Sequence, residues 1–326
     1  MLPVGKLPAG LMQELLEAGA PLPDEVLLGP SVGEDACAIR VPSGVLVVAT
    51  DPITLTGASV GAHAVVINAN DVATTGVTPQ WFLAAVLLPV GTTGEGVRAL
   101  FAEMREALRK LGASLVGGHT EVTAAVSQVV VVGQFLGLSA DGRFVRTGGV
   151  EVGDRVLQVG PAPVEGAAVL AVEAEARLDR LPRTTLEAAR GAIEDPGLSI
   201  VEAALEATRL GAHALHDPTE GGLATGLCEL AQASGLALIV EPEAVLWFEP
   251  GVAVCEALGA DPWGTLASGT LLAAFAADES AQALGALQSA GFRVADIGHA
   301  EPGTGVRTPD GRPLPLFDAD EVVRVL

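Results

Sequence analysis

The chain contains no tyrosine, few aromatic residues and few lysines. Aromatic residues make up 3% of its 326 residues, so it offers few rings on which single-stranded bases could stack. Lys6 and Lys110 are the only lysines, and 18 basic residues face 40 acidic ones, which gives a net charge of -22. A chain this acidic repels phosphate-rich nucleic acid, so we expect no nucleic-acid partner. An anionic small molecule would need metal ions to offset the charge.

Cysteine is also scarce, and long apolar runs are missing. Cys37, Cys228 and Cys255 are far apart in the chain, which disfavours a disulfide framework or a zinc site and favours small buried hydrophobic residues. The longest clearly apolar run, 81–90, contains Pro89 and is well short of the roughly 20 residues that span a membrane. The first ten residues lack a secretory pattern. We therefore expect a cytoplasmic enzyme with no membrane partner.

A lysine-containing phosphate loop is absent as well. Nothing in the chain fits the pattern Gly-x-x-x-x-Gly-Lys-Ser/Thr. The glycine-rich stretch 91–96 is interpreted as a solvent-exposed loop that caps the following helix, and a phosphate-binding loop is the alternative. A nucleotide would therefore have to be bound by distributed acidic and glycine residues.

The order of predicted elements indicates two mixed α/β domains. A chain of this length that is 49% hydrophobic can bury two cores. The first half predicts strands over 36–41, 45–50, 81–88, 114–116 and 128–138, helices over 59–76 and 95–111, and a short helical pattern on Leu11, Leu15 and Leu16. The second half predicts strands over 155–159, 236–240, 269–275 and 293–299, and helices over 166–176, 199–210, 222–234, 250–258 and 280–290. A turn-rich joint near Gly148 places the domains at 1–148 and 149–326.

Four aspartates, Asp35, Asp51, Asp71 and Asp217, stand beside glycines or at the edge of apolar runs. Such carboxylates can hold hard cations like Mg²⁺, which take oxygen ligands and often bridge to phosphates. Asp51 follows the apolar run 45–49, so we expect its carboxylate at the carboxyl end of a strand, where ligands often bind in α/β sheets. A turn or a helix cap is the alternative for any one of them. Four in such contexts favour a metal site.

Asn70 and Asp71 lie inside an otherwise apolar helix pattern over 59–76. Buried side chains of this type need a strong partner, and a cation supplies one. The alternative is a solvated helix face, because Asn68, Asp71 and Thr75 recur at three- and four-residue spacing.

The string Gly117-Gly118-His119-Thr120-Glu121 follows the predicted strand 114–116. Its two glycines would let the backbone approach a ligand closely, and the three polar side chains would then point into one cleft. A structural turn explains the glycines equally well.

The string from His216 to Gly222 is the most specific in the chain. Asp217, Thr219, Gly221 and Gly222 lie just before the predicted helix 222–234. Thr219 is expected to cap this helix, whose first turn would present amide groups to an anion.

Taken together, these strings resemble the PurM-like superfamily of aminoimidazole ribonucleotide synthetase, which includes selenophosphate synthetase, thiamine-monophosphate kinase and the hydrogenase-maturation carbamoyl dehydratase HypE. The matching strings are Gly33-Glu34-Asp35-Ala36, Thr50-Asp51, Asn70-Asp71-Val72-Ala73, Gly117-Gly118-His119-Thr120 and His216-Asp217-Pro218-Thr219-x-Gly221-Gly222. The last string is most similar to HypE.

The resemblance implies an N-terminal α/β domain whose strands pair across a homodimer into a β-barrel, followed by a C-terminal α+β domain. It also implies that ATP binds between the domains and that its γ-phosphoryl group is transferred to an oxygen or selenium nucleophile, with metal ions stabilising the charge. On this basis Mg²⁺ is expected on Asp35, Asp51, Asp71 and Asp217. From the strings themselves we expect nucleotide contacts from Asn70, Gly117, Gly118, Thr120, Thr219, Gly221 and Gly222, and catalytic roles for His119, Glu121 and His216, although His119 stands where relatives vary.

The chain departs from the HypE pattern in three places. HypE proteins end in a Pro-Arg-Ile-Cys-like tail whose cysteine carries the carbamoyl group, whereas no cysteine follows Cys255 here. We therefore expect no carbamoyl dehydration on this chain's own tail. Glu34 stands where the first Asp of an Asp-Asp pair is usual. Glu220 replaces a common Arg, which removes a positive charge beside the phosphate region.

The leading hypothesis is an ATP-dependent enzyme of the HypE-like branch, acting on a small molecule or on a partner protein that supplies the acceptor. One alternative is an assembly or regulatory factor that binds ATP without turnover, and another is thiamine-monophosphate kinase activity. Release of ADP with a substrate, as opposed to tight ATP binding alone, separates the first two.

Overall fold

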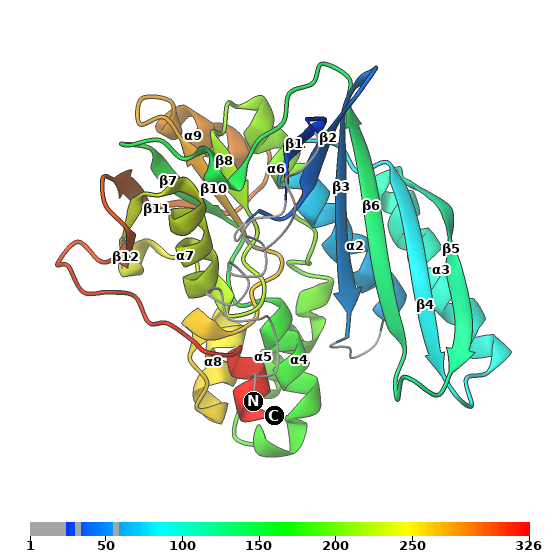
Figure 1. Cartoon of the computed structure of the whole chain (residues 1–326). Helices are drawn as coiled ribbons and strands as arrows, with labels where there is room; N and C mark the ends of the chain where they lie inside the picture. The colour runs from blue at the N-terminus through cyan, green and yellow to red at the C-terminus, as the bar shows by residue number, and fades with distance from the viewer. Residues whose placement is uncertain (1–23, 30–33, 55–58) are drawn as a thin grey trace. The chain divides into compact units, whose positions relative to one another are not determined.

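The computed structural model describes residues 24–29, 34–54 and 59–326 (Figure 1). The helix predicted on Leu11, Leu15 and Leu16, and Gly33 of the first acidic string, lie outside the described residues. The described chain forms two compact units. The first consists of residues 24–29 and 35–144, and the second of residue 34 and residues 145–326. The predicted boundary at 148/149 stays a prediction.

The first unit contains a six-stranded sheet in the order β1-β2-β3-β6-β4-β5. Its strands are β1 (Val26–Leu28), β2 (Cys37–Val41), β3 (Gly44–Ile53), β4 (Trp81–Pro89), β5 (Ser114–Thr123) and β6 (Val130–Ser139). Pairing is antiparallel except between β4 and β5, which run parallel. The ten-residue strand β5 therefore forms one edge of the sheet, and its residues are largely exposed.

Two helices, α2 (Val60–Ala73) and α3 (Gly94–Leu111), lie on one face of this sheet (Figure 1). The side chain of Thr93 accepts a hydrogen bond from the Gly96 amide at 3.1 Å, and α3 ends at Gly112 in the left-handed region. The interpretation of 91–96 as a capping loop is therefore confirmed. Phe82 and Phe135 meet in the core beneath the helices, with ring centroids 5.1 Å apart.

Residues alternate between the two faces of the sheet. In β6, Val131 and Phe135 are fully buried, whereas Val132, Leu136 and Leu138 are only half-buried. The strands β3 and β4 show the same alternation. The face away from α2 and α3 is therefore apolar but only partly covered. Monomeric proteins rarely leave an apolar sheet face of this kind exposed to solvent.

The second unit contains a second six-stranded sheet, in the order β12-β9-β11-β7-β10-β8. Its strands are β7 (Arg155–Val159), β8 (Ala214–His216), β9 (Ala237–Val240), β10 (Leu271–Phe275), β11 (Val294–Glu301) and β12 (Gly305–Arg307). Pairing is antiparallel except between β12 and β9. The strands β7, β9 and β10 are almost entirely buried, so this sheet is packed on both faces.

The α-helices of the second unit are α4 (Glu165–Glu173), α5 (Arg183–Arg190), α6 (Val201–Arg209), α7 (Gly222–Ser234), α8 (Glu249–Leu258), α9 (Ser280–Ser289) and α10 (Glu321–Val325). Helix α7 buries Leu223, Leu227 and Leu230 in the core beside the sheet. A second core gathers α4, α5, α8 and α10 around Leu170 and Val322. No helix among the described residues is long and apolar enough to cross a bilayer.

Most predicted elements are confirmed, with two kinds of error. The bounds of β7 and α7 are as predicted, because each has an unambiguous period and is flanked by glycines. The short strands β1, β8 and β12 and the helices α5 and α10 were not predicted, since three to eight residues carry too little pattern. The predicted strand 114–116 was too short, because β5 continues through the polar residues to Thr123.

Candidate functional site

In the first unit, Asn68 of α2 fixes the backbone of Asp51. Its side-chain oxygen accepts from the Asp51 amide at 2.8 Å, and its side-chain nitrogen donates to the Asp51 carbonyl at 3.1 Å and to the Ala64 carbonyl at 2.9 Å. Asn68 is fully buried and Asp51 half-buried. Helix α2 therefore holds the strand segment that carries the Asp51 carboxylate.

A missing side chain on β6 makes room for this contact. A Cβ at Gly133 would lie 2.3 Å from the Asn68 side-chain nitrogen, so only glycine fits there. The Gly133 carbonyl also accepts from the Thr50 hydroxyl at 2.7 Å. Asp51 of β3 pairs with Gly133 of β6, so it lies inside its strand. The expectation that Asp51 follows the end of the strand is therefore wrong.

The polar residues of α2 do not form a solvated face. Asn68 and Asn70 are fully buried and Thr75 nearly so, while Asp71 is half-buried. The Asp71 carbonyl accepts from the Thr74 hydroxyl at 2.7 Å, which strengthens the end of the helix. The alternative of a water-facing stripe is therefore wrong, and a half-buried carboxylate at Asp71 fits a cation ligand.

Glu34, which takes the place of an expected aspartate, is an anchor for the backbone. Its side chain accepts from the amides of Thr147 at 3.2 Å and Gly148 at 3.4 Å, and forms an ion pair with Arg146 at 3.4 Å. The Glu34 side chain is 5% exposed. The Glu34 side chain therefore binds the backbone at the start of the second unit. The neighbouring Asp35 of the first unit is half-buried.

The string from Gly117 to Glu121 is part of β5 rather than a loop after it. A Cβ at Gly118, which has φ +146°, would lie 2.1 Å from the Ala84 carbonyl oxygen, so close strand pairing explains this glycine. In a strand, His119 and Glu121 lie on one side and Thr120 on the other. The prediction that all three point into one cleft is therefore wrong.

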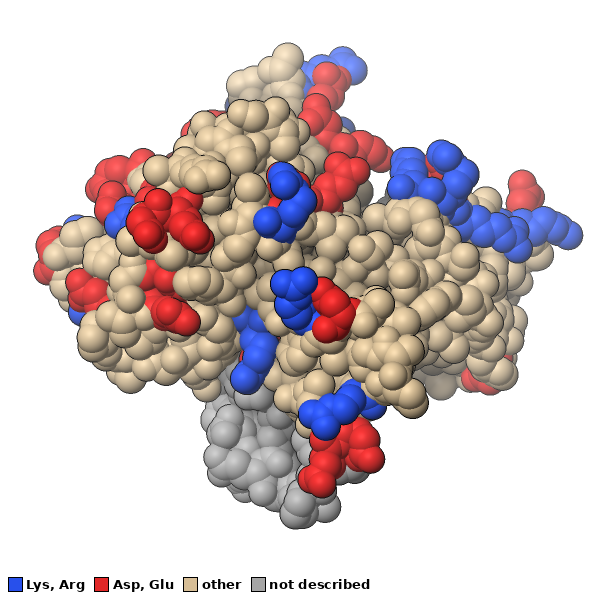
Figure 2. All heavy atoms as spheres, turned by 90° about the horizontal axis from the view of Figure 1, so that it is seen from above, with Lys and Arg blue, Asp and Glu red and all other residues tan. Residues whose placement is uncertain are grey.

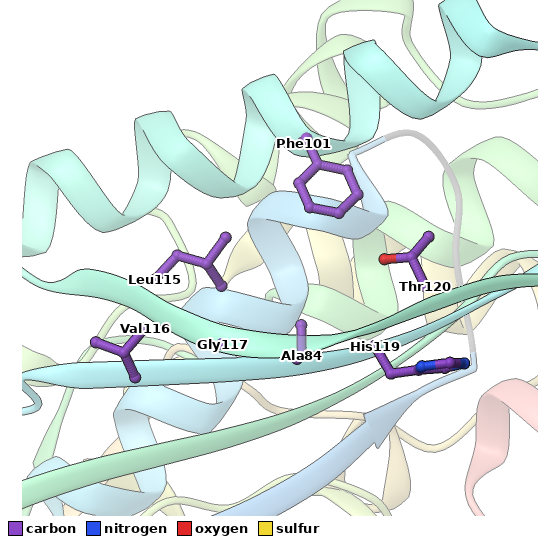
Figure 3. A pocket seen from close by; sticks show the side chains of 8 residues that line it. Ala84, Phe101, Leu115, Val116, Gly117, His119 and Thr120 are labelled. Carbon is purple, nitrogen blue, oxygen red and sulfur yellow. The ribbon is translucent and has the colours of Figure 1, made fainter.

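A hollow of about 390 Å³ lies between α3 and β5 (Figure 3). Phe101 points from α3 towards β5, and Leu115 and Thr120 point from β5 towards α3, whereas His119, which also borders the hollow, leaves the strand on its other side (Figure 3). The His119 Nε2 lies 3.3 Å from the Glu121 carboxylate, and both side chains are about half exposed or more.

In the second unit, His216 is the last residue of β8 and Asp217 follows it directly, and both are almost fully buried. The His216 Nε2 lies 3.0 Å from the Glu229 carboxylate on α7, and one ring nitrogen and the Asp217 carboxylate lie within 4.8 Å of each other. Glu229 was not singled out in the sequence. Glu229 lies two turns into α7, and no local sequence pattern connects it with His216.

The loop before α7 is held by a carboxylate from the C-terminal segment. Helix α7 is preceded by Gly221, whose amide donates to Asp320 Oδ2 at 2.7 Å, and the Gly222 amide donates to the Thr219 carbonyl at 3.0 Å. The expectation that Thr219 caps α7 with its side chain is therefore wrong. Both glycine amides already have acceptors, so any nucleotide contact from Gly221 and Gly222 would come from close backbone approach.

Burial raises the pKa of the Asp320 carboxyl from its ordinary 3.8 to about 6. The amides of Val322, Gly221 and Leu266 act in the opposite direction, and the charge of Glu220 raises the pKa further. Asp261, Glu321 and Cys255 are the other titratable groups close by. The backbone hydrogen bonds therefore offset only part of the cost of burying the charged Asp320 carboxylate.

None of the three cysteines behaves as an activated nucleophile. Burial raises the pKa of the thiols of Cys228 and Cys255 to about 11 and also raises that of Cys37. All three are free, and Cys255 is buried whereas Cys37 and Cys228 are half-buried, so the interpretation as small buried hydrophobic residues is confirmed for Cys255 alone among them. Thiolate chemistry at neutral pH is therefore not available from them.

The donor set fits a hard cation better than a soft one. Asp35, Asp51 and Asp71 offer carboxylate oxygens, and their ligand atoms do not form a group of three within 4.8 Å in the first unit alone. An ion bound mainly by waters and phosphate oxygens, with one or two carboxylates, suits Mg²⁺. Lys and Arg side chains of the described residues stand among Asp and Glu side chains on the face in Figure 2. With 18 basic residues against 40 acidic ones, metal ions would supply much of the positive charge for an anionic ligand.

Both halves of the chain match known protein families. Residues 33–139 match the N-terminal domain, and residues 151–310 the C-terminal domain, of AIR synthase related proteins. The carbamoyl dehydratase HypE of Rhodobacter capsulatus is 31% identical over 259 residues, which cover 77% of this chain and 74% of that protein.

Solved structures share the two-domain PurM-like fold. A structure of HypE in complex with ATP has a TM-score of 0.72 at 24% identity, covering 95% of this chain and 91% of that one. A HypE–HypF complex gives 0.73 at 23%, covering 88% and 94%. Thiamine monophosphate kinase of Aquifex aeolicus gives 0.69 at 20%, covering 94% and 96%. These likenesses establish the fold.

Replacing Asn68 with alanine is expected to lower the free energy of unfolding by about 1–3 kcal/mol, because the Asp51 amide and carbonyl lose their partner. Denaturant-induced unfolding measures the loss. Gln128→Ala is the matched control, since the Gln128 amide also donates to a backbone carbonyl, that of Thr54 at 2.6 Å, but is exposed. It should change stability by less than about 0.5 kcal/mol. Equal losses from the two variants would contradict a special role for Asn68.

Asp320→Asn is expected to change the pH dependence of stability. Because the pKa of Asp320 is raised in the folded chain, its proton adds stability below about pH 4, and this contribution is lost as the pH rises through about 6. The wild-type chain should therefore gain stability relative to Asp320→Asn as the pH falls from about 7 to about 5. Thermal unfolding of both chains across this range measures the difference. A constant difference would show that Asp320 does not titrate there.

Proposed function

Because the chain belongs to the AIR synthase related family, we propose that it is an ATP-dependent phosphoryl-transfer enzyme of the HypE-like branch. It would activate an amide-like oxygen on a small molecule or on a partner protein. The observation that carries this proposal is the buried Asn68–Asp51 arrangement beside Asn70 and Asp71, which fixes carboxylates for a cation in a chain otherwise short of positive charge. The HypE structure that holds ATP supports the choice of nucleotide.

The proposed ligands for Mg²⁺ are Asp35, Asp51, Asp71 and Asp217, and bound Mg²⁺ would neutralise the phosphates and stabilise charge on the transferring group. The chain's own contribution is placement. Asn68 holds the Asp51 backbone, and Glu229 orients the His216 ring beside Asp217. Asn70, Gly117, Gly118, Thr120, Thr219, Gly221 and Gly222 remain the proposed nucleotide contacts, with the last two acting through close backbone approach.

His119, Glu121 and His216 remain the proposed catalytic residues. The exposed His119–Glu121 pair has the reach to take a proton from an incoming group, since each side chain is open to solvent. His216 is buried against Glu229, so it suits holding a fixed charge or orientation rather than exchanging protons with bulk water. Thiamine-monophosphate kinase activity and a catalytically silent ATP-binding role are the competing functions.

A screen for ADP release tests the proposal. Mg-ATP is supplied with primary amides, with thiamine phosphate and with carbamoylated thiols, and the rate is compared with the rate for ATP alone. Turnover that depends on an amide or a carbamoyl group supports the proposal. Turnover only with thiamine phosphate would identify a kinase, and binding of ATP without any turnover would identify a silent factor. Cytoplasmic location stays a prediction.

Asp71→Asn is expected to weaken Mg-ATP binding by at least about tenfold while leaving the fold intact, because one charged oxygen ligand is removed from the cation. Isothermal calorimetry measures the affinity in the presence of Mg²⁺, and circular dichroism checks the fold. Asp141→Asn is the control, since Asp141 is an exposed carboxylate bonded locally to Ser139 and Arg143. Unchanged binding in Asp71→Asn would remove this residue from the metal site.

We also propose a homodimer, formed where the first unit is incompletely covered. Its sheet has an apolar face with half-buried Leu136 and Leu138 and an exposed edge strand β5, so a second copy could continue the sheet into a barrel. The solved HypE–HypF complex supports a further, different partner protein that could supply the acceptor.

Light scattering of the purified chain should therefore give the mass of a dimer at micromolar concentration. The double variant Val116→Lys, Val122→Lys should shift it to the monomer, because lysines on an exposed strand edge oppose pairing. Both valines are more than half exposed, so the fold should survive. Val152→Lys, at an equally exposed position of the second unit, should leave the mass unchanged. A monomeric wild-type chain would overturn the proposed barrel.

A further inference from the structure

The last described turn of the chain is fastened to the segment around the His216–Gly222 loop. The Phe317 ring packs on Gly264, where an added Cβ would lie 2.5 Å from it. Glu321 accepts from the Asp261 amide at 2.7 Å, and Arg177 donates to the Val325 carbonyl at 2.6 Å. Val322 of α10 is fully buried in the core with α4 and α8.

Among the C-terminal residues that make these contacts, Asp320 is the one that hydrogen bonds to the loop between Asp217 and α7. One carboxylate oxygen accepts from the Gly221 amide at 2.7 Å and the other from the Val322 amide at 2.8 Å, so a single side chain joins α7 to α10. The Gly221 amide is among the donors that α7 would otherwise present at its positive end. The acceptor comes from a position 99 residues away in the sequence.

The loop has little freedom on its other sides. Gly221 and Gly222 both have positive φ, and a Cβ at Gly222 would lie 2.4 Å from the Trp263 carbonyl oxygen. The Thr219 carbonyl accepts from the amides of Gly222 at 3.0 Å and Ala267 at 3.2 Å. Asp320 adds the hydrogen bond to the Gly221 amide, so we expect the path of the chain from Asp217 to α7 to depend on it.

We propose that Asp320 is a positioning residue, whose carboxylate holds the loop between Asp217 and α7 in the conformation that presents Asp217 to the cation. The role of Asp217 as a cation ligand rests on the proposed function. The hydrogen bonds of Asp320 to Gly221 and Val322 do not depend on it. The role of Asp320 differs from simple anchoring of α10, because Glu321, one residue later, anchors α10 without touching the loop.

Hydrogen–deuterium exchange of the peptide that contains Gly221, measured without nucleotide, tests the fastening. Asp320→Ala should speed exchange there by about tenfold, and Asp320→Asn by less, because the amide side chain can still accept one hydrogen bond. Formate, a small carboxylate, should slow exchange again in Asp320→Ala, whereas chloride at equal ionic strength should not. Glu321→Gln should leave exchange at Gly221 within about twofold.

Calorimetry with Mg-ATP tests the positioning role. Asp320→Ala should weaken binding by about tenfold, with partial recovery in formate, and Glu321→Gln should not weaken it. Equal effects of the two variants on exchange at Gly221, or no effect of Asp320→Ala, would overturn the proposal. If the wild-type chain binds no Mg-ATP, the proposed function fails, and the exchange experiment still decides whether Asp320 holds the loop.

Discussion

Two hydrogen bonds between the Asn68 side chain and the backbone of Asp51 join helix α2 to the central sheet of the first unit. Asn68 is completely buried, so its amide must find partners inside the protein, and a strand backbone at one fixed position provides them. Because the buried Asn68 side chain needs these two hydrogen bonds, it fixes the position of the Asp51 backbone and with it the base of the Asp51 side chain. The absent side chain at Gly133 is the space that this constraint requires.

Several carboxylates in this acidic chain are engaged in the same way, as acceptors for backbone amides. Glu34 accepts from Thr147 and Gly148, Glu103 from Gly61 at 3.1 Å, Asp154 from Glu151 at 2.9 Å, and Asp320 from Gly221. Each satisfies amides that would otherwise lack a partner at a turn or at the start of a helix. An excess of acidic residues is therefore not by itself a measure of how many metal ligands a protein has.

The sequence was sufficient for the fold, and insufficient for the contacts that hold the proposed site residues in place. Periodicity located α2, α7 and β7 because a helix or strand is determined by residues close in sequence. Asn68 was noticed only as part of a polar stripe, because its partner lies 17 residues away on a strand. Glu34 and Asp320 bond to residues 113 and 99 positions away, and no local pattern reports such pairs. The same limit hid Glu229, whose partner His216 precedes α7.

The open edge of β5 exposes the monomeric chain to aggregation. The ten residues of β5 pair with β4 on one side only, carry Glu121 as their one formal charge and contain no proline, so their outer edge is one that other extended chains can join. Whatever covers this edge in the cell also protects the chain from cross-β growth. A substitution that weakens the cover would therefore act as an aggregation mutation, even though each unit keeps its own fold.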